Sequence, residues 1–233
     1  MITFGVTGTD TGVGKTVVAC AVVAACVARG LRVGVMKPVE TGGADLSQTD
    51  AVKLARAAGY ESAGPDVAPY SFAAPLAPRV AARAAGVSID ISRLDSAFGR
   101  VQRDREVVVV EGAGGLLTPL TTDLAFDTLF ARWKARLVIV AADRLGVLNH
   151  VRLTVAAAGA AGLRVQAIVL NAVDPGLRDG SAGTNLDVVR ELLPAVPVVP
   201  FLWLPDVHDT HALAAAAERA GVLAVLGVEN EET

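Results

Sequence analysis

Short apolar runs alternate with Ala-rich segments of helical length along the whole chain, which leaves few possible folds. The runs rich in Val and Ile predict β-strands at Ile2–Thr7, Arg32–Lys37, Val107–Glu111, Leu137–Ala141, Val165–Asn171 and Val196–Pro200. The intervening segments predict helices at Lys15–Arg29, Thr49–Ala58, Ile91–Arg103, Phe126–Lys134, Leu148–Ala161, Asn185–Leu193 and Thr210–Ala220. Several strands are apolar throughout, which is typical of parallel strands buried on both faces. The pattern therefore predicts an α/β fold with one doubly wound, mostly parallel sheet and helices on both faces.

The chain has 233 residues, a formal net charge of −3, and 52% apolar but only 4% aromatic residues. This length suits a single domain with a large aliphatic core. We expect residues 1–228 to form that domain and 229–233 to be a frayed acidic tail. The sequence contains no basic block and no long uninterrupted apolar run, and we expect no leader segment. We therefore expect no nucleic-acid partner and no membrane partner. We expect a cytoplasmic location.

The segment Gly8–Thr16, with the sequence GTDTGVGKT, follows the first predicted strand and opens the first predicted helix. This arrangement is typical of a phosphate-binding loop, in which glycines let successive backbone N–H groups point at phosphate oxygens. Lys15 can reach the β- and γ-phosphates of a nucleotide, and the Thr16 hydroxyl can bind Mg²⁺. The usual pattern has a glycine at the position of Thr9. The loop is therefore a variant, either with altered curvature or anchored by its two later glycines.

Polar side chains also follow or end other predicted strands, where α/β proteins bind ligands. Lys37 beside a phosphate loop can stabilise charge on a transferring phosphoryl group, although a solvated lysine is the alternative. Glu111 ends an all-valine run, as does the carboxylate that serves Mg²⁺ in many nucleotide-binding proteins. Asp50, taken alone, is typical of the first turn of a helix. Asn171 can pair with adenine or form a turn, and the residues alone leave both possibilities open.

Three further stretches bear on the site. Thr41–Gln48 and Tyr60–Pro78 are expected to be irregular loops close to the ligand. Leu145–His150 begins a helix whose free N–H groups can hold a carboxylate. Cys20 and Cys26 are six apart in one predicted helix, so we expect small buried side chains rather than a disulfide or metal ligands.

Taken together, these segments resemble the dethiobiotin synthetase family of P-loop proteins. The resemblance rests on Gly8–Thr16, Lys37-Pro38-Val39, Val110–Gly115, Leu145–His150 and Asn171, which occur in that family's order and at similar spacing. It implies an ATP-dependent carbon–nitrogen cyclo-ligase of biotin biosynthesis. Such an enzyme forms the ureido ring of dethiobiotin from 7,8-diaminononanoate and CO₂, through a carbamate and a carbamic–phosphoric anhydride, and releases ADP and phosphate. The resemblance also implies ATP and Mg²⁺ as cofactors and a homodimer with the substrate site at the subunit interface.

The resemblance further implies a role for each matching residue. Those implied to bind ATP are Thr11, Gly12, Val13, Gly14, Lys15, Thr16, Asp50, Glu111, Asn171, Phe201, Leu202 and Trp203. Those implied to serve Mg²⁺ are Thr16, Asp50 and Glu111, and those implied to be catalytic are Lys37, Lys15 and Thr11. Those implied to contact the substrate are Lys37, Thr41, Val147, Leu148 and Asn149. Leu202 stands where the family has a proline near the base, so the resemblance does not fix the nucleotide preference.

Two other protein classes share parts of this pattern. Partitioning and septum-siting ATPases carry a second lysine early in the loop, at the position of Asp10, where a carboxylate cannot replace it at a phosphate. Cobyrinate-type amide synthetases take ammonia from a glutaminase domain, for which a chain of 233 residues leaves no room. Both classes are therefore disfavoured by the sequence.

Overall fold

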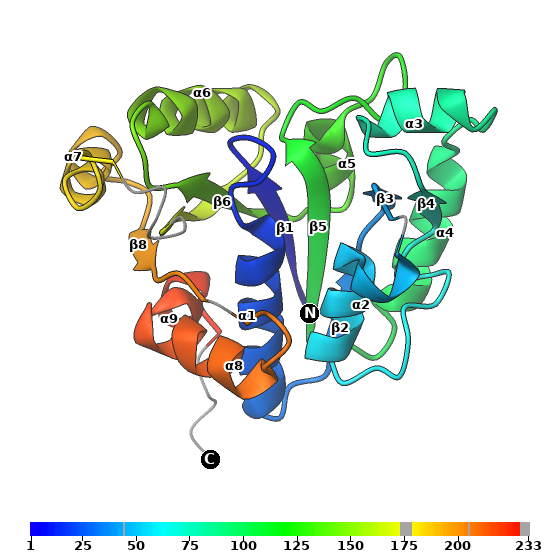
Figure 1. The fold of residues 1–233 in the computed structure, drawn as a ribbon, viewed down its shortest axis with the longest axis horizontal. Helices are drawn as coiled ribbons and strands as arrows, with labels where there is room; N and C mark the ends of the chain where they lie inside the picture. The colour runs from blue at the N-terminus through cyan, green and yellow to red at the C-terminus, as the bar shows by residue number, and fades with distance from the viewer. Residues whose placement is uncertain (44, 173–178, 205, 229–233) are drawn as a thin grey trace.

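The structure is a computed structural model that describes residues 1–43, 45–172, 179–204 and 206–228 (Figure 1). Its main sheet has six parallel strands in the order β2-β5-β1-β6-β7-β8. They are β1 (Ile2–Gly8), β2 (Val33–Met36), β5 (Val107–Gly115), β6 (Arg136–Ala142), β7 (Val165–Asn171) and β8 (Val198–Phe201). All the predicted strands are present, and the predicted α/β class is confirmed. The predicted acidic tail, 229–233, lies outside the described residues.

The apolar runs form strands because both faces of the sheet are covered by helices. β1 lies between β5 and β6, with Phe4 paired to Val109 on one side and to Arg136 on the other. Phe4 is fully buried against one layer of helices. On the opposite face, a Cβ added to Gly5 would lie 2.7 Å from the Phe130 ring, so the glycine lets that ring pack directly on the strand. Burial on both faces explains why these runs show no alternation of apolar and polar residues.

The helices form two layers, one on each face of the sheet. One layer contains α1 (Lys15–Ala28), α2 (Asp50–Ala57), α8 (Thr210–Arg219) and α9 (Val222–Leu226). The other contains α4 (Ile91–Val101), α5 (Phe126–Arg132), α6 (Val147–Ala160) and α7 (Asn185–Leu192). Cys20 and Cys26 are buried free thiols in α1, as predicted. Within the described residues, α1 and the other helices all fall short of the length and apolar character needed to cross a membrane.

Several short elements depart from the sequence prediction. β3 (Val39–Thr41) and β4 (Tyr70–Phe72) pair in parallel as a second sheet, with Glu40 opposite Ser71. A 3₁₀ turn spans Leu46–Gln48. The predictions that Thr41–Gln48 and Tyr60–Pro78 are irregular are therefore wrong in part. Strands of three residues carry too little periodicity to be recognised in a sequence.

Two short helices were also missed, α3 (Pro78–Ala84) and α9. α3 begins with a proline at its first position and has seven residues, and α9 has five. Elements of two turns or less are stabilised by tertiary packing rather than by their own sequence pattern.

The small β3–β4 sheet matters for function because it holds Glu40 and Thr41 at the wall of the site described next.

Candidate nucleotide-binding and active site

The candidate site lies at the carboxyl end of β1, in the middle of the sheet. β2 follows β1 in sequence but lies beyond β5, whereas β6, β7 and β8 lie on the other side of β1. The strand order therefore reverses at β1, and such a reversal opens a ligand-binding crevice at the carboxyl ends of the strands. The loop after Gly8 is tied to the sheet by a hydrogen bond from Thr9 N to Val140 O of 3.0 Å. The loop also curls around Lys15, whose Nζ donates to Asp10 O at 3.0 Å.

The glycines of the loop are required by its geometry. A Cβ on Gly8 would lie 2.6 Å from Asp10 O and 3.0 Å from Lys15 Nζ, so no side chain fits there. Gly14 immediately precedes α1 and has a φ of 92°, which disfavours any residue with a Cβ. A Cβ on Gly14 would lie 2.0 Å from Asn171 Nδ2, and this same amide nitrogen donates to Val13 O at 3.0 Å. The end of β7 is thus bonded to the phosphate loop.

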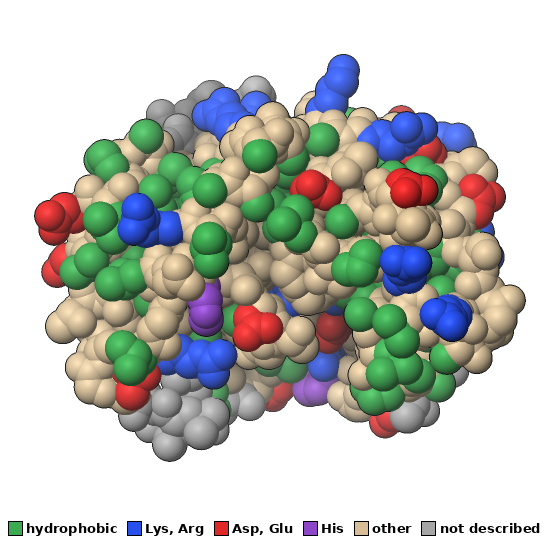
Figure 2. Space-filling view, turned by 90° about the horizontal axis from the view of Figure 1, so that it is seen from above, with side chains coloured by type: hydrophobic (Ala, Val, Ile, Leu, Met, Phe, Trp, Pro, Cys, Tyr) green, Lys and Arg blue, Asp and Glu red, His purple; other side chains and the backbone are tan. Residues whose placement is uncertain are grey.

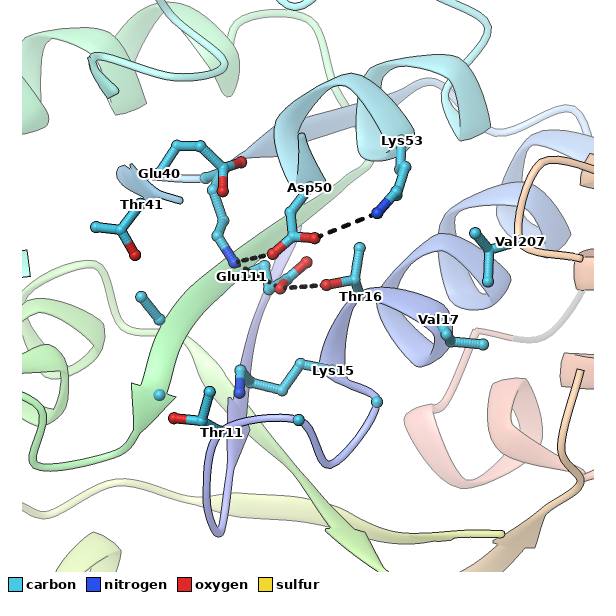
Figure 3. Close-up of a pocket in the computed structure, with 15 residues that line it drawn as sticks. Thr11, Lys15, Thr16, Val17, Glu40, Thr41, Asp50, Lys53, Glu111 and Val207 are labelled. Atoms are coloured by element: carbon cyan, nitrogen blue, oxygen red, sulfur yellow. Dashed lines mark hydrogen bonds and ion pairs between the residues drawn. The ribbon is translucent and has the colours of Figure 1, made fainter. Parts of the chain in front are cut away.

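A cavity of about 370 Å³ opens beside this loop (Figure 3). The predicted site residues that line it are Thr11, Gly12, Gly14, Lys15, Thr16, Lys37, Thr41, Asp50 and Glu111. Its remaining lining residues, to which the sequence assigned no individual role, are Val17, Glu40, Lys53, Ala113, Gly114 and Val207. The cavity therefore brings the phosphate loop, the ends of β2 and β5 and the first turn of α2 to one place.

A buried cluster of charges forms the floor of the cavity. Lys37 Nζ lies 2.6 Å from Glu111 Oε1 and 3.0 Å from Asp50 Oδ2, and it also donates to Gly112 O at 3.1 Å. Thr16 Oγ1 donates to Glu111 Oε1 at 2.8 Å. Lys37 is almost completely buried and Glu111 has no exposed surface. Figure 3 shows Asp50, Glu111 and Thr16 converging from α2, β5 and α1.

The pKa values of these groups follow from burial and from their neighbours. Burial alone would lower the pKa of Lys37, but the carboxylates of Glu111 and Asp50 outweigh it and raise that pKa, so Lys37 stays charged. Burial raises the pKa of Glu111, and the Lys37 ammonium opposes this rise. Burial would also raise the pKa of Asp50, but the more exposed Asp50 is dominated by Lys37 and has a lowered pKa. Burial lowers the pKa of Lys15, which lies deep in the loop.

The donor set fits a hard divalent cation. Thr16, Asp50 and Glu111 offer a hydroxyl and two carboxylates, the oxygen ligands that Mg²⁺ prefers. Within the described residues, no hydrogen-bond partner reaches Glu111 Oε2, although this atom is buried. A buried carboxylate oxygen without a donor is stabilised by a cation. These three residues are therefore the ones that could hold Mg²⁺.

Other predicted site residues do not line this cavity. Val147–Asn149 form the first turn of α6, with the Val147 side chain buried and that of Asn149 exposed. Asn171 contacts the back of the phosphate loop rather than the cavity. Phe201 is buried in the core, whereas Leu202 and Trp203 are exposed after the end of β8. Val13 is also buried, and it takes part in the site through its backbone carbonyl.

Two charged residues of the cavity escaped the sequence analysis. Glu40 lies next to Thr41 on β3, a strand too short to be predicted. Lys53 lies one turn after Asp50 on α2, with its Nζ 3.8 Å from Asp50 Oδ1. The helical spacing of three residues was a usable signal for Lys53, because it places both side chains on one face of the helix.

Comparison with known proteins first supports the class of protein that the fold and the phosphate loop indicate. A protein-family model described as an AAA domain matches residues 3–215. The MinC:MinD cell division protein complex of Aquifex aeolicus shares the fold, with a TM-score of 0.58 at 12% identity, over 100% of this chain and 98% of that chain. The fold, the loop and the family model define a P-loop α/β protein.

Curated relatives narrow the class. The ATP-dependent dethiobiotin synthetase BioD of Anaeromyxobacter dehalogenans (strain 2CP-C) is 42% identical over 202 residues, or 87% of this chain and 90% of the relative. The protein of the same name from Xanthomonas oryzae pv. oryzae (strain PXO99A) is 37% identical over 223 residues, or 94% of this chain and 96% of the relative. The chain belongs to the ATP-dependent dethiobiotin synthetase family.

Proposed function

We propose that this chain uses ATP to close the ureido ring of dethiobiotin from 7,8-diaminononanoate and CO₂, a step of biotin biosynthesis. One observation carries the proposal beyond family membership. The phosphate loop and the Lys37–Glu111–Asp50 cluster line the same cavity, so phosphate-binding groups and a buried ammonium face one ligand space. A phosphate loop by itself would be consistent with any nucleotide hydrolase.

The proposed reaction has three steps. One substrate amine attacks CO₂ and loses a proton, which forms a carbamate. A carbamate oxygen then attacks the γ-phosphorus of ATP, and ADP leaves. The second amine attacks the carbonyl carbon of the resulting carbamic–phosphoric anhydride and loses a proton, and phosphate leaves as the five-membered ring closes. In each step, two reactants must be held in contact and negative charge must be neutralised. The protein provides the positioning and the neutralising positive charge.

The residues of the cavity supply the positive field. The backbone of Thr11–Thr16 and the Lys15 ammonium bind the triphosphate, and Thr11 faces the transferred group. Lys37 stays protonated because its carboxylate neighbours raise its pKa, so it can stabilise the carbamate and the phosphoryl group. When bound, Mg²⁺ adds the positive charge that the triphosphate requires, and Thr16, Asp50 and Glu111 hold it. Thr41 donates its hydroxyl to the substrate.

The remaining predicted residues act outside this cavity. Asn171, which is already bonded to the loop, contributes to binding the base, together with the backbone of Phe201–Trp203. The first turn of α6, Val147–Asn149, binds the substrate carboxylate through free N–H groups. Because this turn does not line the cavity of its own chain, it serves the site of a second copy in a homodimer.

The proposal is tested by phosphate release from Mg·ATP in the presence of bicarbonate. We expect release to depend on 7,8-diaminononanoate, with a product heavier than the diamine by one carbonyl group and lighter by two hydrogens. The Lys15→Ala variant, which removes the cation of the phosphate loop, is the control and should release no phosphate. Phosphate release that is indifferent to the diamine would contradict the synthetase and favour a nucleotide-dependent switch.

A further inference from the structure

Glu40 differs from the other acidic residues that line the cavity. The acidic residues that line the cavity are Glu40, Asp50 and Glu111. Asp50 pairs with Lys37 and Lys53, and Glu111 pairs with Lys37. Glu40 forms no ion pair with any residue that the structure describes. Among the residues that the structure describes, its carboxylate accepts one hydrogen bond, from Ala51 N to Oε2 at 2.9 Å.

The burial of Glu40 makes this isolation costly. The residue is 3% exposed, although it lines the cavity. A buried carboxylate is unfavourable unless a cation or several donors compensate it. Burial raises the pKa of Glu40, and the Lys37 ammonium and the Ala51 N–H offset this rise only in part. One backbone donor leaves most of its acceptor capacity unused. A cationic group entering the cavity would therefore be stabilised at this wall.

The position of Glu40 restricts which cation can reach it. Glu40 and Thr41 lie on β3, and Figure 3 shows them on the opposite side of Asp50 from Lys53. Lys15 and the phosphate loop lie on the far side of Glu111 in the same view. Under the proposed function the triphosphate and its metal bind on the loop side, so the β3 wall would face the other reactant. That reactant, under the proposed function, is a diamine, whose alkylammonium groups are protonated near neutral pH.

We propose that the Glu40 carboxylate binds one ammonium group of the diamine substrate and thereby selects a diamine over a monoamine. This assignment rests on the proposed function and deepens it. A charge-assisted hydrogen bond from ammonium to carboxylate is about twice as strong as a neutral one. The group bound in this way is held beside Lys37, where the carbamate formed by the other amine would be stabilised.

If Glu40 had a purely structural role, its substitution would have a different effect on diamine binding. The carboxylate also receives the N–H of Ala51, in the first turn of α2, and so helps to place Asp50. That role needs an acceptor oxygen but no charge. Glu40→Gln keeps an acceptor oxygen and removes the charge, whereas Glu40→Ala removes both. The two variants therefore separate substrate binding from helix positioning.

The experiment is calorimetric titration of 7,8-diaminononanoate, and separately of ADP, into the wild type and both variants. We expect Glu40→Gln to weaken diamine binding by about 10- to 100-fold and to leave ADP binding within about twofold, as the loss of one charged hydrogen bond implies. Binding of the monoamine 8-aminononanoate should change less. Glu106→Gln is the matched control, because Glu106 accepts the backbone N–H of Arg32 at 2.9 Å on the surface.

The outcomes distinguish the two proposals. Diamine binding by Glu40→Gln that equals the wild type, with a loss confined to Glu40→Ala, would overturn the assignment and leave Glu40 a positioning residue. An equal loss for diamine and monoamine would overturn the selectivity. No diamine binding by the wild-type protein would overturn the proposed function itself, and this assignment with it.

Discussion

Lys37 and Glu111 form an ion pair with almost no contact with water, since their side chains are 4% and 0% exposed. Removing two charges from water costs several kcal/mol each, and their attraction repays this only when the geometry is good. Apolar residues would fill the same volume at no such cost. The pair is therefore better explained by the chemistry of the site than by stability. It keeps the Lys37 ammonium charged and holds it against the Glu111 carboxyl group before ligands arrive.

This explanation predicts an asymmetry between single and double substitutions. Lys37→Met leaves Glu111 buried without its ion-pair partner, so we expect the free energy of unfolding to fall by about 3–5 kcal/mol. Glu111→Gln in the same chain removes the stranded charge and keeps an acceptor for Thr16, so the double variant should regain most of that loss. Both variants should be inactive, because the ammonium is gone. Urea denaturation measures the stabilities.

A matched control is available at the edge of the same cluster. Lys53→Met removes a partner that is 23% exposed and lies 3.8 Å from Asp50. We expect this change to cost less than about 1 kcal/mol. If Lys37→Met were as stable as Lys53→Met, the buried pair would not be held as the structure describes. If the double variant were no more stable than Lys37→Met, the stranded carboxylate would not be the cause of the loss.

At the scale of elements, the phosphate loop is shaped by β7 as well as by its own sequence. Asn171 at the end of β7 bonds Val13 O, and its amide occupies the space that a Gly14 side chain would need. Gly12 also has a positive φ, 72°, but nothing lies within 4 Å of an added Cβ. The two glycines are therefore required for different reasons, one by backbone conformation alone and one by conformation and contact.

Alanine substitutions should separate these reasons. Gly12→Ala is expected to lower the free energy of unfolding by about 1–2 kcal/mol, the cost of a left-handed residue with a Cβ. Gly14→Ala should cost more, because it also displaces the Asn171 amide. In an Asn171→Ala background, the further cost of Gly14→Ala should fall toward that of Gly12→Ala. Thermal unfolding of the four variants tests this, and an undiminished cost in that background would show that the Asn171 contact is not what excludes a side chain.

The elements that the sequence predicted and those that it did not differ in length. Strands such as β5, with four consecutive valines, and helices such as α1 carry enough pattern to be recognised. β3 has three residues, and its pairing with β4 depends on a crossover through α2 that no local pattern encodes. Glu40 was missed for this reason. Whether a carboxylate such as Glu40 is solvated or buried in a cavity wall depends on which strands pair, and a single sequence does not show the pairing.

At the scale of the whole molecule, many of the residues that line the cavity were named from the sequence, whereas their grouping in space was not predicted. Most lie at the carboxyl ends of strands, and parallel strands bring those ends together. The order of the strands was not predictable, so neither was the placement of Asn171 behind the loop rather than in the cavity. The first turn of α6 also lies outside the cavity. Under the proposed function, this turn would therefore have to come from a second copy of the chain.

A subunit-mixing experiment decides whether the site is shared. Asn149→Asp places a carboxylate where the substrate carboxylate is proposed to bind, so it should repel the substrate, while an acidic residue in a first helical turn does not harm folding. Lys37→Ala removes the ammonium of the cavity. In a two-fold symmetric dimer with shared sites, each variant alone is inactive, but a mixed dimer has one site that carries both changes and one that is intact. Equal mixing after subunit exchange should therefore restore about one quarter of the wild-type activity. If each chain supplied its whole site, the mixture would stay as inactive as its components, and α6 would have to reach the cavity of its own chain by a movement of the fold.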